Sequence, residues 1–189
     1  MNPVKLVVKL MEEEPLVELA EHDLNLRVQT NPFAVPLDLQ YVKQWHLHTA
    51  LNDPDFDTRA CSLCEDAWRL LDHFGSESVV VAITDDGCKL DHQDFDSPDK
   101  FADWGYFRDE RLITRSDIDA DPDEMYKPGA NHGTSCAGVV AGETDAVLTV
   151  GAAPGCRLLP IQWESDGPEL YISDSKILTV LISLPTRSM

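Results

Sequence analysis

The chain has 189 residues, of which 43% are hydrophobic, and it carries a formal net charge of -19 at pH 7. This length and composition are typical of a folded domain with a core, and they exclude a disordered chain. The 34 acidic residues outnumber the 15 basic ones, so we expect no nucleic-acid partner and no anionic membrane surface. Divalent cations and basic peptides are compatible with this charge.

The first thirty residues predict a small unit of their own. Residues 4–10 alternate as in a strand, and residues 13–22 have the apolar spacing of a short helix. No stretch of the chain is long and apolar enough to predict a membrane span. Three glutamates at 12–14 argue against a secretory signal. We therefore expect a cytoplasmic protein if Met1 is the true start, and a secreted one if the chain is internal to a longer product.

The rest of the chain alternates between helical and extended patterns. An amphipathic helix is predicted over 61–74 and a strand over 79–84, whose continuous apolar run indicates burial on both faces. Residues 91–128 are acidic and predict loops. Further along, the predicted elements are a helix over 133–141, a strand over 157–162 that Pro160 weakens, and a helix over 172–184. This alternation predicts an α/β fold with a doubly wound parallel sheet.

Two residues stand where such a sheet builds its sites. Asp85 closes the predicted strand, and His132 opens a helix rich in small residues, 47 positions later. Sites form at the carboxyl ends of parallel strands, and a carboxylate beside an imidazole can ready a hydroxyl for attack. Taken alone, Asp85 would be explained as a residue that caps a strand end, and His132 as a helix-start residue with no catalytic role. Their joint occurrence favours a catalytic pair.

The surrounding motifs resemble those of the subtilisin-like serine proteases, the subtilases or peptidase S8 family. The aspartate motif, the histidine motif and the turn and strand that follow it are matched by residues 81–95, 132–142 and 151–160. The kexin and proprotein-convertase branch is the most similar, because it favours a doubled Asp-Asp-Gly and a cysteine at the position of Cys136. The resemblance covers roughly residues 36–180.

The resemblance implies a domain organisation and an activity. Residues 1–30 are similar to the tail of a propeptide, an α+β segment. Residues 31–60 then form a linker and lead-in segment, and residues 61–189 form the N-terminal half of a subtilisin-like catalytic domain whose sheet is incomplete. The implied function is a serine-type endopeptidase acting on peptide or protein substrates, in which Asp85 orients His132 and His132 acts as the base.

The nucleophile is missing from the pattern. No serine stands in a Gly-Thr-Ser-x-Ala-x-Pro motif, and the oxyanion-hole asparagine is also absent. We therefore expect this chain by itself to be inactive. Two alternatives stay open: a truncated, non-catalytic subtilase-like binding protein, and a thiol peptidase in which Cys136 is the nucleophile.

The resemblance also implies calcium (Ca2+) sites and a specificity residue. The positions that match the calcium ligands of relatives are Asp38, Asp94 and Asp145, with Asp121 and Asp123 as weaker candidates for a second ion. Solvated surface acids are the alternative interpretation for all five. Asp86 either binds basic side chains of a substrate by charge pairing or only solvates its turn.

Overall fold

The computed structural model describes residues 8–9, 11–12, 34–51, 53–166 and 169–183. The chain divides into two units, residues 1–32 and residues 33–189. In the first unit, Val8 and Lys9 are helical, so the strand predicted over 4–10 is wrong at both of its described positions. The helix predicted over 13–22 lies outside the described residues.

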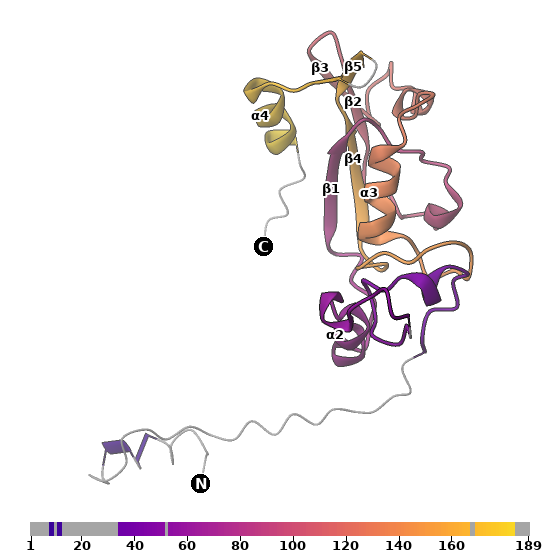
Figure 1. Cartoon of the computed structure of the whole chain (residues 1–189). Helices are drawn as coiled ribbons and strands as arrows, with labels where there is room; N and C mark the ends of the chain where they lie inside the picture. The colour runs from indigo at the N-terminus through magenta and orange to yellow at the C-terminus, as the bar shows by residue number, and fades with distance from the viewer. Residues whose placement is uncertain (1–7, 10, 13–33, 52, 167–168, 184–189) are drawn as a thin grey trace. The chain divides into compact units, whose positions relative to one another are not determined.

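The second unit carries the helices and strands, which are labelled in Figure 1 where there is room. In chain order they are the 3-10 helices η1 (Tyr41–Lys43) and η2 (Thr58–Ala60), helix α2 (Cys64–Leu71), strand β1 (Val80–Asp85), the 3-10 helix η3 (Gln93–Phe95), strands β2 (Gly105–Arg108) and β3 (Arg111–Thr114), the 3-10 helix η4 (Pro122–Met125), helix α3 (His132–Ala141), strands β4 (Arg157–Gln162), β5 (Glu164–Asp166) and β6 (Glu169–Tyr171), and helix α4 (Asp174–Ser183). None of the helices in the described part of the chain is long and apolar enough to cross a membrane.

The main sheet is mostly parallel, with the strand order β1-β4-β2-β3. Strands β1 and β2 both pair with β4 in parallel, whereas β3 returns antiparallel to β2. The fold is therefore of the α/β class. Residues of β1 pack on both faces, as predicted, with Ile83 on the α3 side and Val80 and Ala82 on the α4 side. The strand is only partly buried, because within the described residues it is an edge strand that pairs with β4 alone.

The β2–β3 hairpin corrects a second prediction, since it lies in the stretch expected to be loop. Its two-residue turn is Asp109-Glu110, and both residues have positive φ values, 48° and 63°. A tight hairpin turn needs this left-handed backbone, which Asn and Gly adopt most readily. The sequence offers neither residue there, so the hairpin signal is lacking.

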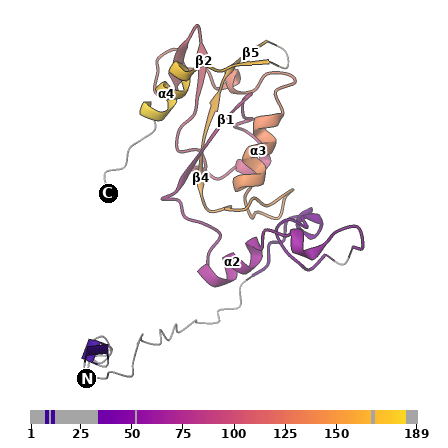
Figure 2. The same cartoon turned by 60° about the vertical axis from the view of Figure 1, so that its left-hand side comes forward.

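Helices lie on both faces of the main sheet, α3 on one and α4 on the other (Figures 1 and 2). Successive residues of β4 point to opposite faces, so Leu158 packs with Ala137 and Ala141 of α3. On the other face, Leu159 and Ile161 pack with Val180 of α4. This packing fixes the start of α3 near the carboxyl end of β1.

A separate apolar cluster anchors the lead-in segment. Tyr41 and Leu47 pack against Trp68 of α2 and against Val150. The Gln44 side chain adds two hydrogen bonds to the backbone of Val150, accepting from its N–H at 2.9 Å and donating to its C=O at 2.8 Å. The segment that carries Asp38 is thereby held beside the loop that follows α3.

Candidate active site

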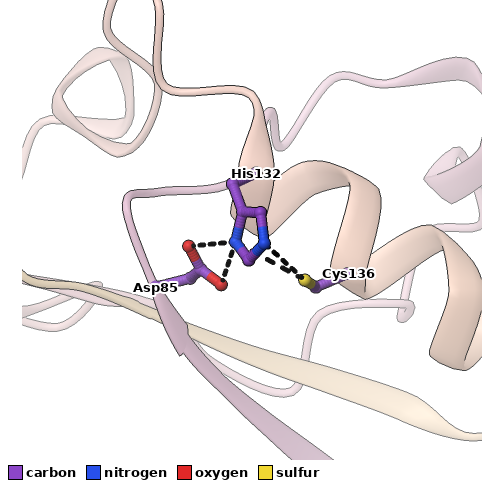
Figure 3. A group of neighbouring side chains, drawn as sticks. All are labelled: Asp85, His132 and Cys136. Carbon is purple, nitrogen blue, oxygen red and sulfur yellow. Dashed lines mark hydrogen bonds and ion pairs between the residues drawn. The ribbon is translucent and has the colours of Figure 1, made fainter. Parts of the chain in front are cut away.

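The end of β1 and the start of α3 bring Asp85 and His132 into direct contact. Nδ1 of His132 lies 2.9 Å from each carboxylate oxygen of Asp85. Figure 3 shows the imidazole between Asp85 on one side and Cys136 on the other. The two residues that the sequence pattern singled out are therefore hydrogen-bonded neighbours.

The two side chains differ in their exposure and shift each other's pKa. The Asp85 side chain is 14% exposed, and that of His132 is 75% exposed. Burial alone would raise the pKa of Asp85, but hydrogen bonds from the Asp86 N–H and from the His132 ring lower it below its ordinary value. The hydrogen bond to the Asp85 carboxylate, followed by its charge, raises the pKa of His132. The pair thus stabilises a protonated imidazole beside an ionised carboxylate.

Cys136 lies one helical turn after His132, with its Sγ 3.7 Å from Nδ1 and 3.9 Å from Nε2. Atoms of Asp85, His132 and Cys136 that could bind a metal all lie within 4.8 Å of one another. Burial and the charge of Asp85 raise the pKa of the Cys136 thiol. A raised pKa disfavours the thiolate that a thiol peptidase needs.

Ser135 and Asp86 make contacts with the backbone at the start of α3. The Ser135 hydroxyl donates to the C=O of Asn131 at 2.9 Å, so it is bonded to its own helix. The Asp86 carboxylate accepts from the backbone N–H groups of His132 and Gly133. The sequence did not predict the contact between Asp86 and the start of α3, because it depends on how α3 docks against β1.

Asp145, one of the three principal candidate calcium ligands, contacts Asp38 and lies close enough to Asp38 and Asp94 to be influenced by their charges. Asp38 and Asp94 are 3% and 2% exposed, and the Asp145 N–H donates to Asp38 Oδ1 at 3.2 Å. Across the described residues, the buried side-chain oxygens without a hydrogen-bond partner are Asp38 Oδ2, Asp94 Oδ1 and Asp145 Oδ2. Buried carboxylate oxygens are normally satisfied, and oxygens from separated segments are the ligands that calcium prefers. The donor set therefore fits a calcium ion.

The electrostatics of this cluster are compatible with a bound cation. Burial, followed by the charges of Asp38 and Asp94, raises the pKa of Asp145. Close carboxylates repel one another unless a proton or a cation lies between them. Asp96, which no motif singles out, and Glu143 each place a carboxylate oxygen within 4.8 Å of one on Asp145. The acidic cluster is thus larger than the motif indicated.

The two weaker calcium candidates lie elsewhere, at the start of η4. Asp121 and Asp123 are exposed. The Asp121 side chain accepts a hydrogen bond from the Asp123 N–H at 3.0 Å, which caps the short helix. Their carboxylates lack the buried, unsatisfied oxygens that distinguish Asp38, Asp94 and Asp145.

In an α/β fold, sites form at the carboxyl ends of parallel strands, and a carboxylate–imidazole pair at such an end is compatible with triad-type hydrolase chemistry. The peptidase S8 domain, the Subtilase family, matches residues 76–178. The chain belongs to this family, and the match includes both Asp85 and His132.

Several curated proteins are similar to the chain. A calcium-dependent protease of Trichormus variabilis is 35% identical over 123 residues, 65% of this chain and 16% of that protein. Human proprotein convertase subtilisin/kexin type 4 is 27% identical over 151 residues, 78% of this chain and 18% of the convertase. Human furin is 27% identical over 152 residues, 78% of this chain and 17% of furin. The chain thus matches less than a fifth of the length of each of these relatives.

Proposed function

We propose that this chain contributes the aspartate and histidine of a subtilisin-like serine endopeptidase. In this mechanism His132 takes the proton of a serine hydroxyl at Nε2 as the hydroxyl attacks the peptide carbonyl, and later gives that proton to the leaving amine. Asp85 holds the ring through Nδ1 and stabilises the imidazolium that forms. The observation that carries the proposal is the 2.9 Å contact between Asp85 and a largely exposed His132.

The serine of the triad is proposed to lie outside these 189 residues. The chain has no Gly-Thr-Ser-x-Ala-x-Pro segment, and the hydroxyl of Ser135 is bonded to its own helix. The chain by itself is then inactive, since the hydroxyl and the oxyanion hole are both needed for turnover. The missing serine motif equally favours the second candidate, a non-catalytic subtilase-like protein that binds peptides.

A structural Ca2+ held by Asp38, Asp94 and Asp145 belongs to the same proposal. Bound calcium would neutralise the three carboxylates, of which Asp38 and Asp94 are buried, and would join the lead-in segment, η3 and the loop after α3. The cited relative from Trichormus variabilis is named for its calcium dependence. A second ion at Asp121 and Asp123 has weaker support, because these carboxylates are exposed.

The finer organisation is proposed on the same basis. Helices on both faces of the sheet support a doubly wound, subtilisin-like arrangement. We propose residues 1–30 as a propeptide-like tail, residues 31–60 as a linker and lead-in segment, and residues 61–189 as the first half of a catalytic domain. Peptides or proteins are the proposed substrates.

A fluorophosphonate probe, which labels activated serines, tests the activity. The probe is applied to the 189-residue chain and to the product of the uninterrupted reading frame that contains it. We expect the longer product to be labelled, its His132→Ala variant not to be labelled, and the 189-residue chain to stay unlabelled. Labelling that survives His132→Ala would refute the proposed mechanism, and a reading frame that ends at Met189 would establish the non-catalytic alternative.

A further inference from the structure

Helix α3 begins without a cap from its own sequence. The N-cap residue, Asn131, makes no side-chain hydrogen bond to the first turn. The first N–H groups of a helix have no partner within the helix and need an acceptor from elsewhere. Asp86, 46 residues earlier in the chain, supplies one: its Oδ2 accepts from the His132 N–H at 3.1 Å, and its Oδ1 accepts from the Gly133 N–H at 2.7 Å.

We propose that Asp86 is a positioning residue, which clamps the start of α3 to the end of β1 so that the His132 ring meets Asp85. The clamp explains why two adjacent carboxylates stand at this strand end. Asp85 holds the side chain of His132, and Asp86 holds the backbone of the same residue. The role of this pair in peptide hydrolysis rests on the proposed function, whereas the clamp itself is a matter of geometry.

Other contacts around the clamp leave the helix start little room to move. The Lys89 N–H donates to Oγ1 of Thr134 at 3.0 Å. This is a further hydrogen bond between the segment that follows β1 and the first turn of α3. The buried Gln162 side chain donates to the C=O of Asp86 at 3.1 Å, so β4 holds Asp86 in place. The backbone of Asp86 is thus held by β4, while its side chain binds the first N–H groups of α3.

The charge of Asp86 suits this position. The first turn of a helix carries partial positive charge, and a carboxylate there forms charge-assisted hydrogen bonds with the free N–H groups. Both carboxylate oxygens of Asp86 are engaged in this way. Pairing with a basic side chain of a substrate, the alternative use of Asp86, would compete with these two bonds.

Three substitutions separate the hydrogen bonds from the charge. Asp86→Ala, Asp86→Asn and Asp86→Ser all remove the negative charge, but Asn and Ser keep a side-chain oxygen that can cap a helix. The readout is the tautomer of neutral His132, from the 15N shifts of its ring nitrogens in the full chain. Contact with Asp85 holds the proton on Nδ1, so the Nδ1–H fraction reports how well the two side chains are aligned.

We expect Asp86→Ala to lose most of the Nδ1–H tautomer, and Asp86→Asn and Asp86→Ser to retain most of it. Near-UV circular dichroism establishes that each variant is folded. The control is Asp57→Ala, which removes an exposed carboxylate that caps the short helix η2 and should leave the His132 tautomer unchanged.

Two results would overturn the proposal. One is a folded Asp86→Ala variant with an unchanged tautomer. The other is an equal loss of the Nδ1–H tautomer in all three variants, which would assign the effect to the charge of Asp86 and not to its hydrogen bonds. If the three variants also lost binding to an arginine-containing peptide equally, Asp86 would be identified as a substrate contact. The readout needs no turnover, so a protein that lacks peptidase activity could still confirm the clamp. If the clamp proposal were refuted, the fluorophosphonate test of the proposed function would still stand.

Discussion

Gly133 and Asp85 approach so closely that a Cβ atom on Gly133 would lie 2.7 Å from the Cβ of Asp85. The same added atom would lie 2.2 Å from the backbone oxygen of Gly87. The start of α3 is therefore seated directly on the turn that follows β1. The absence of a side chain at Gly133 allows the adjacent His132 to reach Asp85.

Replacing Gly133 with alanine should therefore destabilise the protein. A backbone oxygen at 2.2 Å cannot rotate away, so the helix start must shift, which typically costs about 1–3 kcal/mol. The matched control is Gly138→Ala in the same helix, where an added Cβ meets nothing within 4 Å and should stabilise the helix by up to about 1 kcal/mol. Urea unfolding curves measure both, and equal effects of the two substitutions would contradict the close seating.

Calcium should raise the melting temperature of the chain. At a free concentration about a hundredfold above Kd, binding contributes about 2.7 kcal/mol, which corresponds to a rise of roughly 5–10 °C for a chain of this size. Asp38→Asn should abolish the rise. Without calcium this variant should be at least as stable as the unsubstituted chain, because the charge repulsion between residue 38 and Asp145 is removed. Differential scanning calorimetry with and without calcium measures both effects.

Asp121→Asn is the control for the calcium experiment, because it removes an exposed carboxylate outside the buried cluster. We expect the calcium response of this variant to match that of the unsubstituted chain. A response lost in Asp121→Asn and kept in Asp38→Asn would place the ion at η4 and contradict the assignment to Asp38, Asp94 and Asp145.

Cys136 should react slowly with iodoacetamide at pH 7. Its thiol pKa lies above the ordinary value because of burial and the charge of Asp85, and the thiolate is the reactive form. Asp85→Asn should accelerate the reaction by removing that charge. Site-resolved mass spectrometry follows the rate at Cys136 alone. Fast alkylation that slows in His132→Gln would instead support a thiolate–imidazolium pair and revive the thiol-peptidase alternative.

The stabilising interaction between Asp85 and His132 should depend on pH in both directions. Because the pKa of His132 is raised, its contribution is complete below the ordinary value of 6.5 and is lost as the pH rises through the folded-state pKa. Because the pKa of Asp85 is lowered, its contribution is complete above 3.8 and is lost as the pH falls through the folded-state pKa. A double-mutant cycle with Asp85→Asn and His132→Gln should therefore give its largest coupling between these two values. A coupling that does not vary with pH would argue against an ion pair.

The elements that the sequence predicted well are those with strong local patterns. The apolar run of β1 and the small-residue helix α3 could be read from neighbouring residues alone, and β4 was predicted with its observed bounds, Arg157–Gln162. Pro160 did not prevent β4 from forming. The Leu158 N–H donates to the C=O of Lys100 on the β2 side of β4. Because backbone N–H groups two residues apart in a strand point the same way, the nitrogen of Pro160 also faces the β2 side. On that side of β4, the described pairing stops after Leu158, which is bridged to Phe101, and resumes at Ile161, which pairs with Gly105. Position 160 lies in this gap, so the missing N–H of proline leaves no pairing bond unmade.

The site was only partly predictable, because some of its contacts depend on tertiary packing. The motifs around Asp85 and His132 indicated their proximity, since strand ends and helix starts meet at one edge of such a sheet. The clamp by Asp86 depends on the angle at which α3 docks, which no local pattern encodes. The same holds for the unsatisfied oxygens of Asp38, Asp94 and Asp145, whose burial follows from three separate segments meeting.

An NMR titration of His132 tests the central claim most directly, that Asp85 and His132 form one acid–base unit. In the unsubstituted chain the ring should titrate above its ordinary pKa of 6.5, and in Asp85→Asn its pKa should fall back toward that value. A pKa at or below 6.5, or one that Asp85→Asn leaves unchanged, would contradict the account.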